Sequence, residues 1–410
     1  MSKVVQFPYT MPGPELSMAV FKLGFLRRFF ANVMVPATPD IAAEVVTAMQ
    51  ERWEKPRPDG CDRGWREVKV LDTVQGIVAR SMSIVYIGKE LARESGYVDA
   101  MIRAITAIPA CGTAMSIFPE VLRGIAANVV CFPSRYYRWR LGNKYLCQEI
   151  VKRKAIVEGR LSPVEETDFL LNFIAATQKA KNPIYYETDV ILTTFIIHNI
   201  AAVHTMSGTF TAVVENLLRY PGHIPLLRTE AERIISHPHD PITWTKSEIN
   251  ELKLHEAFIR ETMRLWPLMH STMTRTAMHE EGYRFRDGSF VPAGFSLGVA
   301  AQAVHTDEQH YEHPMQFDPK RFTGEQVKMK KDFLASTSQT FLTWGDGHHA
   351  CPGRFFASHV LKILLASLVL NYEIEAASHA PRAERSLGIL KIPNHMLIVR
   401  VRRIIPGPGS

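Results

Sequence analysis

The 410-residue sequence is poor in cysteine, and the few cysteines it has form no recognisable framework. There are five of them, with no Cys-x-x-Cys pair and no regular spacing, at Cys61, Cys111, Cys131, Cys147 and Cys351. This pattern argues against a disulfide-stapled secreted fold and against a structural zinc site. A reducing compartment is therefore the default expectation.

An excess of charge of one sign is also lacking. The 48 Lys and Arg residues against 41 Asp and Glu leave a net charge of +7 over the whole chain, which is weak support for binding nucleic acid. The hydrophobic content of 46% excludes a disordered chain and predicts a large buried core. Length alone would suggest two or three domains.

The first thirty residues lack the basic-then-apolar pattern of a signal peptide. The one long uncharged run, 190–214, is long enough to cross a bilayer. However, it contains His198, His204 and five threonines, and this polarity favours a buried central helix over a membrane span. We expect neither a signal peptide nor a transmembrane anchor in this chain.

Apolar residues at three- and four-residue spacing predict a mainly α-helical fold. Helices are expected at 40–55, 69–90, 97–180, 190–214, 223–237, 246–266 and 353–370. Prolines are expected to break the third of these at Pro109, Pro119, Pro133 and Pro163, and Ser247 is the expected N-cap of the sixth. Short runs of Thr, Phe, Tyr and Val over 271–305 predict a small antiparallel sheet, and the end of the chain at 384–404 reads as a strand.

The most informative stretch is the loop from Trp344 to Arg354, with the sequence WGDGHHACPGR. Gly345 and Gly347 permit backbone conformations that a side chain would block, and they allow close approach to a flat ligand. Cys351 comes just before the next helix, where free N–H groups and the helix dipole favour a thiolate. These features suggest haem with an axial sulfur ligand; the alternative is an ordinary buried cysteine in a glycine turn.

The loop resembles the haem-binding signature of the cytochrome P450 family, with Trp344 in place of the usual Phe and His349 where many members have Arg. Three further family motifs occur upstream in the family's order. Glu261-Thr262-Met263-Arg264 matches Glu-x-x-Arg, and Phe317-Asp318-Pro319-Lys320-Arg321-Phe322 matches the Pro-x-Arg-Phe element. Ala201-Ala202-Val203-His204-Thr205-Met206 resembles the oxygen-activation motif of the long central helix. The resemblance looks closest to fungal secondary-metabolism members.

The resemblance implies a role for each matching residue. Cys351 would be the axial ligand of haem b iron, with Trp344, Gly345, Gly347, His349 and Arg275 around the cofactor. Thr205 and His204 would manage protons and water at bound oxygen. The alternative for Thr205 is a helix-interior threonine bonded to its preceding turn, and a histidine bonded to a neighbouring carbonyl is an equal alternative for His204. Glu261, Arg264 and Arg321 would form a structural charge cluster.

The resemblance further implies a single P450-like domain over 1–410, with a haem-binding core at about 183–375. It would be N-terminally shortened, without the usual anchor and early sheet, and either cytoplasmic or peripheral on the endoplasmic reticulum membrane. The expected activity is insertion of one oxygen atom from O2 into an apolar small molecule, such as a terpenoid or alkaloid. NADPH–cytochrome P450 reductase would supply the electrons, docking near a basic run at Lys320, Arg321, Lys328, Lys330 and Lys331. Two alternatives remain: a truncated haem-binding protein without turnover, and a desaturase or rearrangement enzyme using the same haem.

Overall fold

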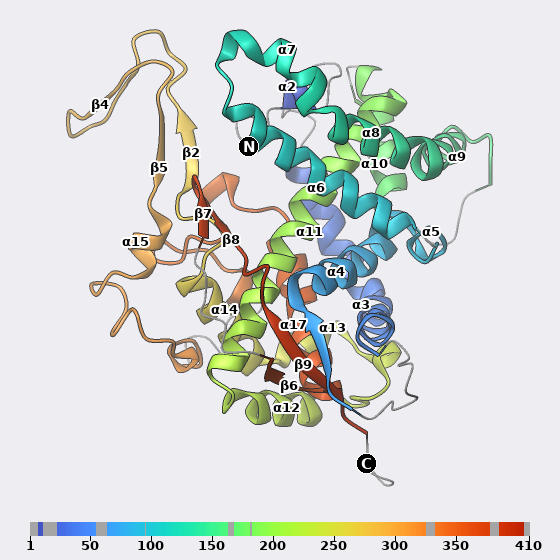
Figure 1. The fold of residues 1–410 in the computed structure, drawn as a ribbon, viewed down its shortest axis with the longest axis vertical. Coiled ribbons are helices and arrows are strands. Elements are labelled where there is room, and N and C mark those ends of the chain that lie inside the picture. The colour runs from blue at the N-terminus through green and yellow to red at the C-terminus, as the bar shows by residue number, and fades with distance from the viewer. Residues whose placement is uncertain are drawn as a thin grey trace. The chain divides into compact units, whose positions relative to one another are not determined.

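The computed structural model describes residues 7–10, 23–54, 64–94, 96–162, 168–180, 183–324, 333–377 and 385–405. The chain divides into two compact units. Unit 1 comprises Met1–Pro56, Asp72–Ser207 and Asp240–Thr243, and unit 2 comprises Arg57–Leu71, Gly208–His239 and Trp244–Ser410. The expected mainly helical fold with small antiparallel sheets is confirmed (Figure 1).

Unit 1 is built almost entirely from helices. They are α2 (Phe7–Thr10), α3 (Leu23–Trp53), most of α4 (Val70–Ile87), α5 (Lys89–Ala92), α6 (Tyr97–Ser116), α7 (Glu120–Val130), α8 (Phe132–Leu141), α9 (Cys147–Val157) and α10 (Phe169–Gln178). A π-helical turn, η2 (Gly142–Leu146), joins α8 to α9, and 3-10 turns lie at η3 (Pro183–Tyr186) and η4 (Pro241–Thr243). In Figure 1, α6 runs beside α8, with which it makes extensive contact.

Prolines break the segment 97–180 less often than the sequence predicts. Pro119 does precede a helix, as the N-cap of α7, and Pro133 lies in the first turn of α8. Pro109, however, lies inside α6, so the expected break there is wrong. Pro163 lies outside the described residues. A proline tolerated inside a helix leaves the carbonyl of the residue four positions earlier without its usual donor. Here that residue is Ile105.

The long uncharged run forms α11 (Thr188–Arg219), a helix of 32 residues of which those up to Ser207 belong to unit 1 and those from Gly208 to unit 2. By length and composition, five helices in the described part of the chain could span a membrane, and α11 is one of them. In its most apolar stretch 78% of the residues are buried inside the structure. The prediction of a buried central helix is therefore confirmed for this segment.

Unit 2 combines helices with four small sheets. Its helices are α12 (His223–Ile234), α13 (Lys246–Glu251), α14 (Lys253–Leu265), α15 (Ala301–His305) and α17 (Arg354–Asn371), with 3-10 turns η5 (Pro319–Phe322), η6 (Phe333–Ala335) and η7 (Gly347–His349). The strands are β1 (Arg66–Lys69), β2 (Thr272–Thr276), β3 (Tyr283–Arg284), β4 (Phe290–Val291), β5 (Ser296–Val299), β6 (Tyr372–Ala376), β7 (Arg385–Leu387), β8 (Leu390–Ile392) and β9 (Ile398–Arg403). The apolar helix α17 packs against α12, α13 and α14.

The expected sheet over 271–305 is present as two antiparallel pairs, β2 with β5 and β3 with β4. A further sheet was not expected from the sequence. Its strand order is β1-β9-β6, so that β9 lies between two strands from distant parts of the chain (Figure 1). The sequence assigns Lys69 to a helix, whereas Lys69 ends β1 and pairs with Ile398. The pairing across more than 300 residues has no local sequence signal.

The predicted helix at 246–266 is divided in two at Leu252, whose backbone leaves the helical region at φ −72° and ψ 75°. Its N-cap is Thr245 and not Ser247. The Thr245 hydroxyl accepts the backbone N–H of Glu248, while the Glu248 carboxylate accepts the N–H of Thr245, a reciprocal capping box. Thr245 and Ser247 are both good caps by type, and the position of Glu248 three residues after Thr245 decides between them.

Candidate functional site

The loop around Cys351 is closed by backbone hydrogen bonds within unit 2. The N–H of Cys351 donates to the carbonyl of Trp344 at 2.8 Å, and the N–H of Ala350 donates to the carbonyl of Gly347 at 3.2 Å. Gly345 and Gly347 adopt φ values of +70° and +66°, the left-handed region that favours glycine. The two glycines are therefore needed for the turn that brings Cys351 to the start of α17.

The sulfur of Cys351 lies at the N-terminus of α17, where backbone N–H groups of Gly353 and Arg354 donate to it. These donors and the charge of Arg354 favour the thiolate, as expected from the sequence. Burial nevertheless has the larger effect and raises the pKa of the Cys351 thiol. Burial therefore opposes the effect of the backbone donors at this helix start.

The middle of the loop faces outward. Gly347, His348 and His349 are exposed, and the two imidazole rings meet edge to face at 5.3 Å. A Cβ added at Gly347 would meet nothing within 4 Å, so open space lies beside the backbone there. Accessible backbone next to a partly buried sulfur leaves room for a flat ligand at this loop.

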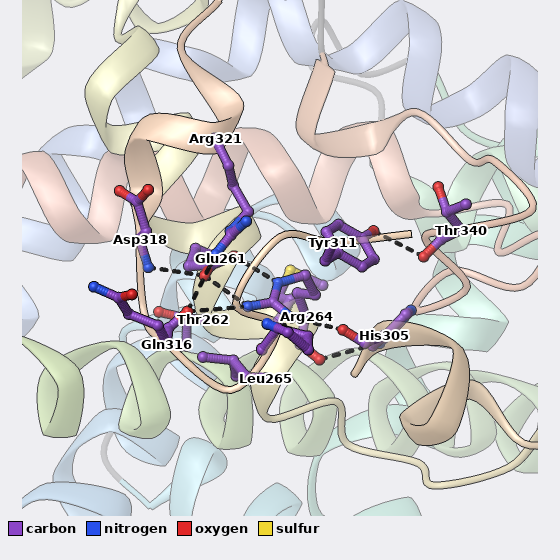
Figure 2. Close-up of polar contacts among 12 residues, drawn as sticks. Glu261, Thr262, Arg264, Leu265, His305, Tyr311, Gln316, Asp318, Arg321 and Thr340 are labelled. Atoms are coloured by element: carbon purple, nitrogen blue, oxygen red, sulfur yellow. Dashed lines mark hydrogen bonds and ion pairs between the residues drawn. The ribbon is translucent and has the colours of Figure 1, made fainter. Parts of the chain in front are cut away.

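Glu261, Arg264 and Arg321 form the expected cluster (Figure 2). Both carboxylate oxygens of Glu261 accept from Arg264, at 2.7 and 2.8 Å, and Oε1 also accepts from Arg321 at 3.1 Å. Glu261 and Arg264 are both fully buried. Because a buried charge without a partner is expensive, the two depend on each other.

The same cluster ties down the chain that leads to the Pro-x-Arg-Phe element. Arg264 also donates to the carbonyl of His305 at 2.6 Å, and Glu261 accepts the N–H of Asp318 at 2.9 Å (Figure 2). A further bond joins Arg264 to the carbonyl of Pro314 at 2.8 Å. Arg321 was expected in a basic surface run as well as in the cluster. Its side chain is instead largely buried against Glu261, so it is not a surface cation. Lys328, Lys330 and Lys331 lie outside the described residues.

His305 connects the cluster to the segment that precedes the cysteine loop. Its Nδ1 lies 3.1 Å from the carbonyl of Arg264, and its Nε2 accepts the N–H of Leu342 at 2.8 Å. An acceptor at Nε2 requires the proton on Nδ1, so the ring is neutral and its tautomer is set. Burial lowers the pKa of His305 to about 4, and the charges of Arg264 and Arg260 act in the same direction.

Thr205 lies on α11, within unit 1. Between residues 190 and 217, all of them described, it is the one exposed residue. Ala201 and Ala202, one turn earlier, are half-buried. The Thr205 hydroxyl donates to the carbonyl of Ala201 at 2.6 Å, which leaves its oxygen lone pairs available as acceptors. The middle of α11 thus presents a small, mostly apolar accessible face with one hydroxyl.

His204 makes two hydrogen bonds within unit 1. One of them is to a backbone carbonyl, which is the alternative interpretation of this histidine. Its Nε2 lies 3.1 Å from the carbonyl of Ile105 on α6, and its Nδ1 lies 3.1 Å from the side-chain amide of Gln75 on α4. The carbonyl must accept, so Nε2 carries the proton and Nδ1 accepts from Gln75. Burial lowers the pKa of His204, which keeps the ring neutral.

Arg275 is in β2, opposite Leu297 of β5, and its guanidinium is exposed. Its Nη1 donates to the carbonyl of Thr274 at 3.0 Å. The strand has an irregular register after Thr272, and Met273 adopts a φ of +54°. This bulge turns the following side chains, including that of Arg275.

Sequence reasoning missed several polar residues that hold the site: the buried Glu256, Arg260 and His305, and the half-buried Gln75. Glu256 and Arg260 precede the Glu-x-x-Arg motif on the same helix. Their charge within an otherwise buried helix was an available signal, since charged residues are seldom buried without a purpose. Gln75 and His305 had no local signal.

The residues present fit a haem. Cys351 offers a soft sulfur ligand supported by backbone donors, and the loop beside it has accessible backbone. A cysteine held in this way at a helix start suits a haem-thiolate protein.

Comparison with known proteins agrees with this class. The family model described as Cytochrome P450 matches residues 25–399. Cytochrome P450 monooxygenase 71 from Postia placenta is 29% identical over 394 residues, covering 93% of this chain and 74% of that protein. Cytochrome P450 monooxygenase avaL from Aspergillus versicolor is 28% identical over 395 residues, covering 90% and 69%. The crystal structure of the cytochrome P450DA haem domain has a TM-score of 0.68 at 16% identity, covering 98% of this chain and 81% of that one.

This chain therefore belongs to the cytochrome P450 family, as its motifs predicted. Its cofactor is haem with a cysteine thiolate bound to the iron, and it is a monooxygenase. The expectations of family, fold class, enzyme class and cofactor are confirmed.

Proposed function

We propose that this protein inserts one oxygen atom from O2 into an apolar small molecule, with Cys351 as the thiolate ligand of the haem iron. The observation that supports this most is the Cys351 sulfur itself, which accepts backbone N–H groups at the start of α17. When bound, the haem would supply oxygen activation, and Cys351 would hold its iron through a sulfur that donates electron density. Replacing Cys351 by Ala should abolish the thiolate-type band of the reduced, carbon-monoxide-bound protein; a variant that keeps the full band would refute the assignment.

The neighbouring residues would shape and hold the cofactor edge. Gly345 and Gly347 set the turn, and Trp344 closes it through its carbonyl. His349 and Arg275 are both exposed and cationic or protonatable, which suits contact with haem propionates. The variants His349→Gln and Arg275→Gln should each speed haem loss to apomyoglobin. If both variants release haem at the native rate, the proposed contacts of His349 and Arg275 with the propionates are refuted.

Thr205 would hold water and pass protons at the oxygen-binding face of α11. Its hydroxyl is accessible and its lone pairs are available, whereas the side chains one turn earlier are alanines. Thr205→Ala should raise the NADPH consumed for each molecule of product, because the hydroxyl that would hold water and pass protons is lost, whereas Thr205→Ser keeps a hydroxyl and should keep the coupling. Equal coupling in Thr205→Ala and the native protein would contradict this role.

His204 would act beside Thr205, and its two hydrogen bonds favour a positioning role. A group that passes protons has to exchange partners during turnover, and both ring nitrogens of His204 are already bonded to protein groups. The comparison of His204→Gln with His204→Ala separates the roles. Loss of coupling in both variants indicates proton delivery, whereas recovery in His204→Gln, which can still donate to a carbonyl, indicates positioning.

Electrons would come from NADPH through a cytochrome P450 reductase, and the substrate would be an apolar metabolite of the terpenoid or alkaloid kind. The small apolar residues Ala201 and Ala202 on the accessible face of α11 support an apolar substrate. Lys320 is exposed and could face an acidic reductase. NADPH consumption with reductase at rising ionic strength tests the partner, since steering by charge weakens with salt. Product analysis separates hydroxylation from desaturation or rearrangement.

We also propose that α7 contacts a membrane surface. Val121, Ile125 and Val129 recur every four residues on this helix and are 87%, 76% and 79% exposed. The following helix α8 exposes aromatic and basic side chains, among them Trp139 and Arg140. An apolar stripe beside aromatic and basic residues is the pattern of a helix lying in a membrane interface.

Vesicle binding tests this contact directly. The variant V121N/I125N/V129N should lose most of its co-sedimentation with phosphatidylcholine vesicles, because the buried apolar area supplies the free energy. A matched control, M278N/M315N, changes two methionines that are 84% and 74% exposed elsewhere on the chain. Equal binding by the native protein, the α7 variant and the control would overturn the proposal.

A further inference from the structure

Two charged side chains of α14, Glu256 and Arg260, hold the short turn η6. They are one helical turn apart, and both are buried. Arg260 Nη1 donates to the carbonyls of Phe333 and Ser336, at 2.7 and 3.2 Å. Glu256 Oε1 accepts the N–H of Leu334 at 2.6 Å. One face of α14 therefore binds both a backbone N–H and backbone carbonyls of this turn.

Arg260 occupies an unusual environment for a cation. Its guanidinium carbon lies 3.7 Å from the ring centroid of Phe341 and 4.0 Å from that of Phe333, and a third ring, Phe322, lies at 5.2 Å. Stacking on ring faces offsets part of the cost of burying the charge. Burial still lowers the pKa of Arg260 to about 10. An uncharged side chain would fill this space without the desolvation cost of a buried charge. The function of the cation here is therefore to bind the backbone carbonyls of the turn.

The turn held by Arg260 is directly bonded to the cysteine loop. The carbonyl of Leu334 accepts the indole N–H of Trp344 at 2.7 Å, and the carbonyl of Trp344 accepts the N–H of Cys351 at 2.8 Å. A second link joins the Thr337 hydroxyl to the carboxylate of Asp346 at 2.8 Å. A phenylalanine in place of Trp344 would fill similar space but could not donate to Leu334.

We propose that Arg260 and Glu256 are positioning residues for the Cys351 loop, acting through the hydrogen bond between Leu334 and Trp344. This inference rests on the proposed role of Cys351 as the iron ligand. The route has two steps: α14 fixes the carbonyl of Leu334, and that carbonyl orients the indole whose backbone closes the loop. If Arg260 is lost, the acceptor shifts and Cys351 gains freedom to leave its position.

The test uses the haem-loaded full chain and follows the thiolate-type band of the reduced, carbon-monoxide-bound protein over time in mild urea. Arg260→Met and Trp344→Phe should each speed the loss of this band by about twofold to tenfold, the effect of one hydrogen bond. Arg260→Lys keeps a donor and should lie between Arg260→Met and the native protein. Arg228→Lys is the matched control, because Arg228 also donates to two backbone carbonyls of unit 2, those of Val369 and Tyr372, at 2.6 and 3.3 Å.

The double variant R260M/W344F decides whether the two residues share one route. It should lose the band no faster than the more severe single variant, since both changes break the same connection. Additive rates, or single variants that only lower the melting temperature as Arg228→Lys does, would overturn the proposal. Should Arg260→Met fail to fold, Trp344→Phe and Arg260→Lys still give the comparison.

Failure of the underlying assignment gives a different result. If Cys351→Ala keeps the thiolate-type band, Cys351 is not the ligand, and the proposed function fails together with this inference. If Cys351→Ala loses the band while Arg260→Met and Trp344→Phe match the native protein, only the positioning role is refuted.

Discussion

The imidazole Nε2 of His204 lies 3.1 Å from the carbonyl of Ile105, a helix carbonyl whose usual donor would be the N–H of residue 109. Residue 109 is a proline and has no N–H. His204 on α11 thus supplies a hydrogen bond that α6 cannot make for itself. This pairing explains both why Pro109 is tolerated inside α6 and why the residue before Thr205 is a histidine with a fixed tautomer.

A double-mutant cycle tests this pairing. His204→Phe should cost about 1–3 kcal/mol in the free energy of unfolding, because it leaves the Ile105 carbonyl buried without a donor. Pro109→Ala restores an N–H to α6, and it should therefore stabilise the His204→Phe variant more than it stabilises the native protein. Urea unfolding measures all four proteins. Strict additivity of the two changes would show that the proline and the histidine are independent.

The Glu261–Arg264 pair predicts a large and specific loss of stability. Replacing Glu261 by Gln leaves the guanidinium of Arg264 buried without its carboxylate, which should cost about 3–5 kcal/mol. Arg321→Lys should cost less, because lysine keeps the positive charge beside Glu261 and the pair with Arg264 survives. Haem content and urea midpoints should fall together in Glu261→Gln. A variant that loses activity but keeps native stability would contradict the structural role.

His305 predicts a loss of stability in mild acid. Its pKa falls from 6.5 in the unfolded chain to about 4 in the fold, so between these values the unfolded chain binds more protons. The contribution of neutral His305 to the free energy of unfolding is complete above about pH 6.5 and disappears as the pH falls towards 4. Its size is on the order of 3 kcal/mol, since one pKa unit corresponds to about 1.4 kcal/mol.

The variant His305→Gln isolates this effect, because glutamine does not titrate. Unfolding free energies at pH 7 and pH 4.5 should differ less in His305→Gln than in the native protein. His348→Gln, at an exposed position, serves as the control and should keep the native pH dependence. An unchanged pH dependence in His305→Gln would exclude His305 as its source.

Gly208 on α11 predicts a steric effect on the β7–β8 hairpin within unit 2. A Cβ at this position would lie 2.9 Å from Pro393 Cγ and 3.0 Å from Leu268 Cδ2. Because the proline ring cannot rotate away, Gly208→Ala should displace the segment around Pro393, which is bonded to the 268–270 segment through the N–H of Lys391. Amide hydrogen exchange at 389–393 should increase. Gly222→Ala is the control, since a Cβ there meets nothing within 4 Å. Equal exchange in both variants would refute the steric effect.

Most of the helices and the identity of the family followed from the sequence, because both depend on short-range patterns. The uncharged run of α11, the capping residues and the order of the four motifs can be read locally. The N-cap predicted at Ser247 was wrong, although Glu248 three residues after Thr245 marks Thr245 as the capping-box residue. Whether Arg321 was a surface cation or a buried partner also depended on contacts with a distant carboxylate.

The sequence by itself thus determined that this chain has a cysteine loop before a helix, a Glu-x-x-Arg helix and a hydroxyl-bearing central helix. Only the tertiary structure decided the buried partners: His204 for the carbonyl freed by Pro109, Arg260 for the turn that holds Trp344, and β9 for β1. The physical reason is that a buried polar group must find a partner wherever the folded chain places one. For these groups the partner lies from about 70 to more than 300 residues away, beyond the reach of any local pattern.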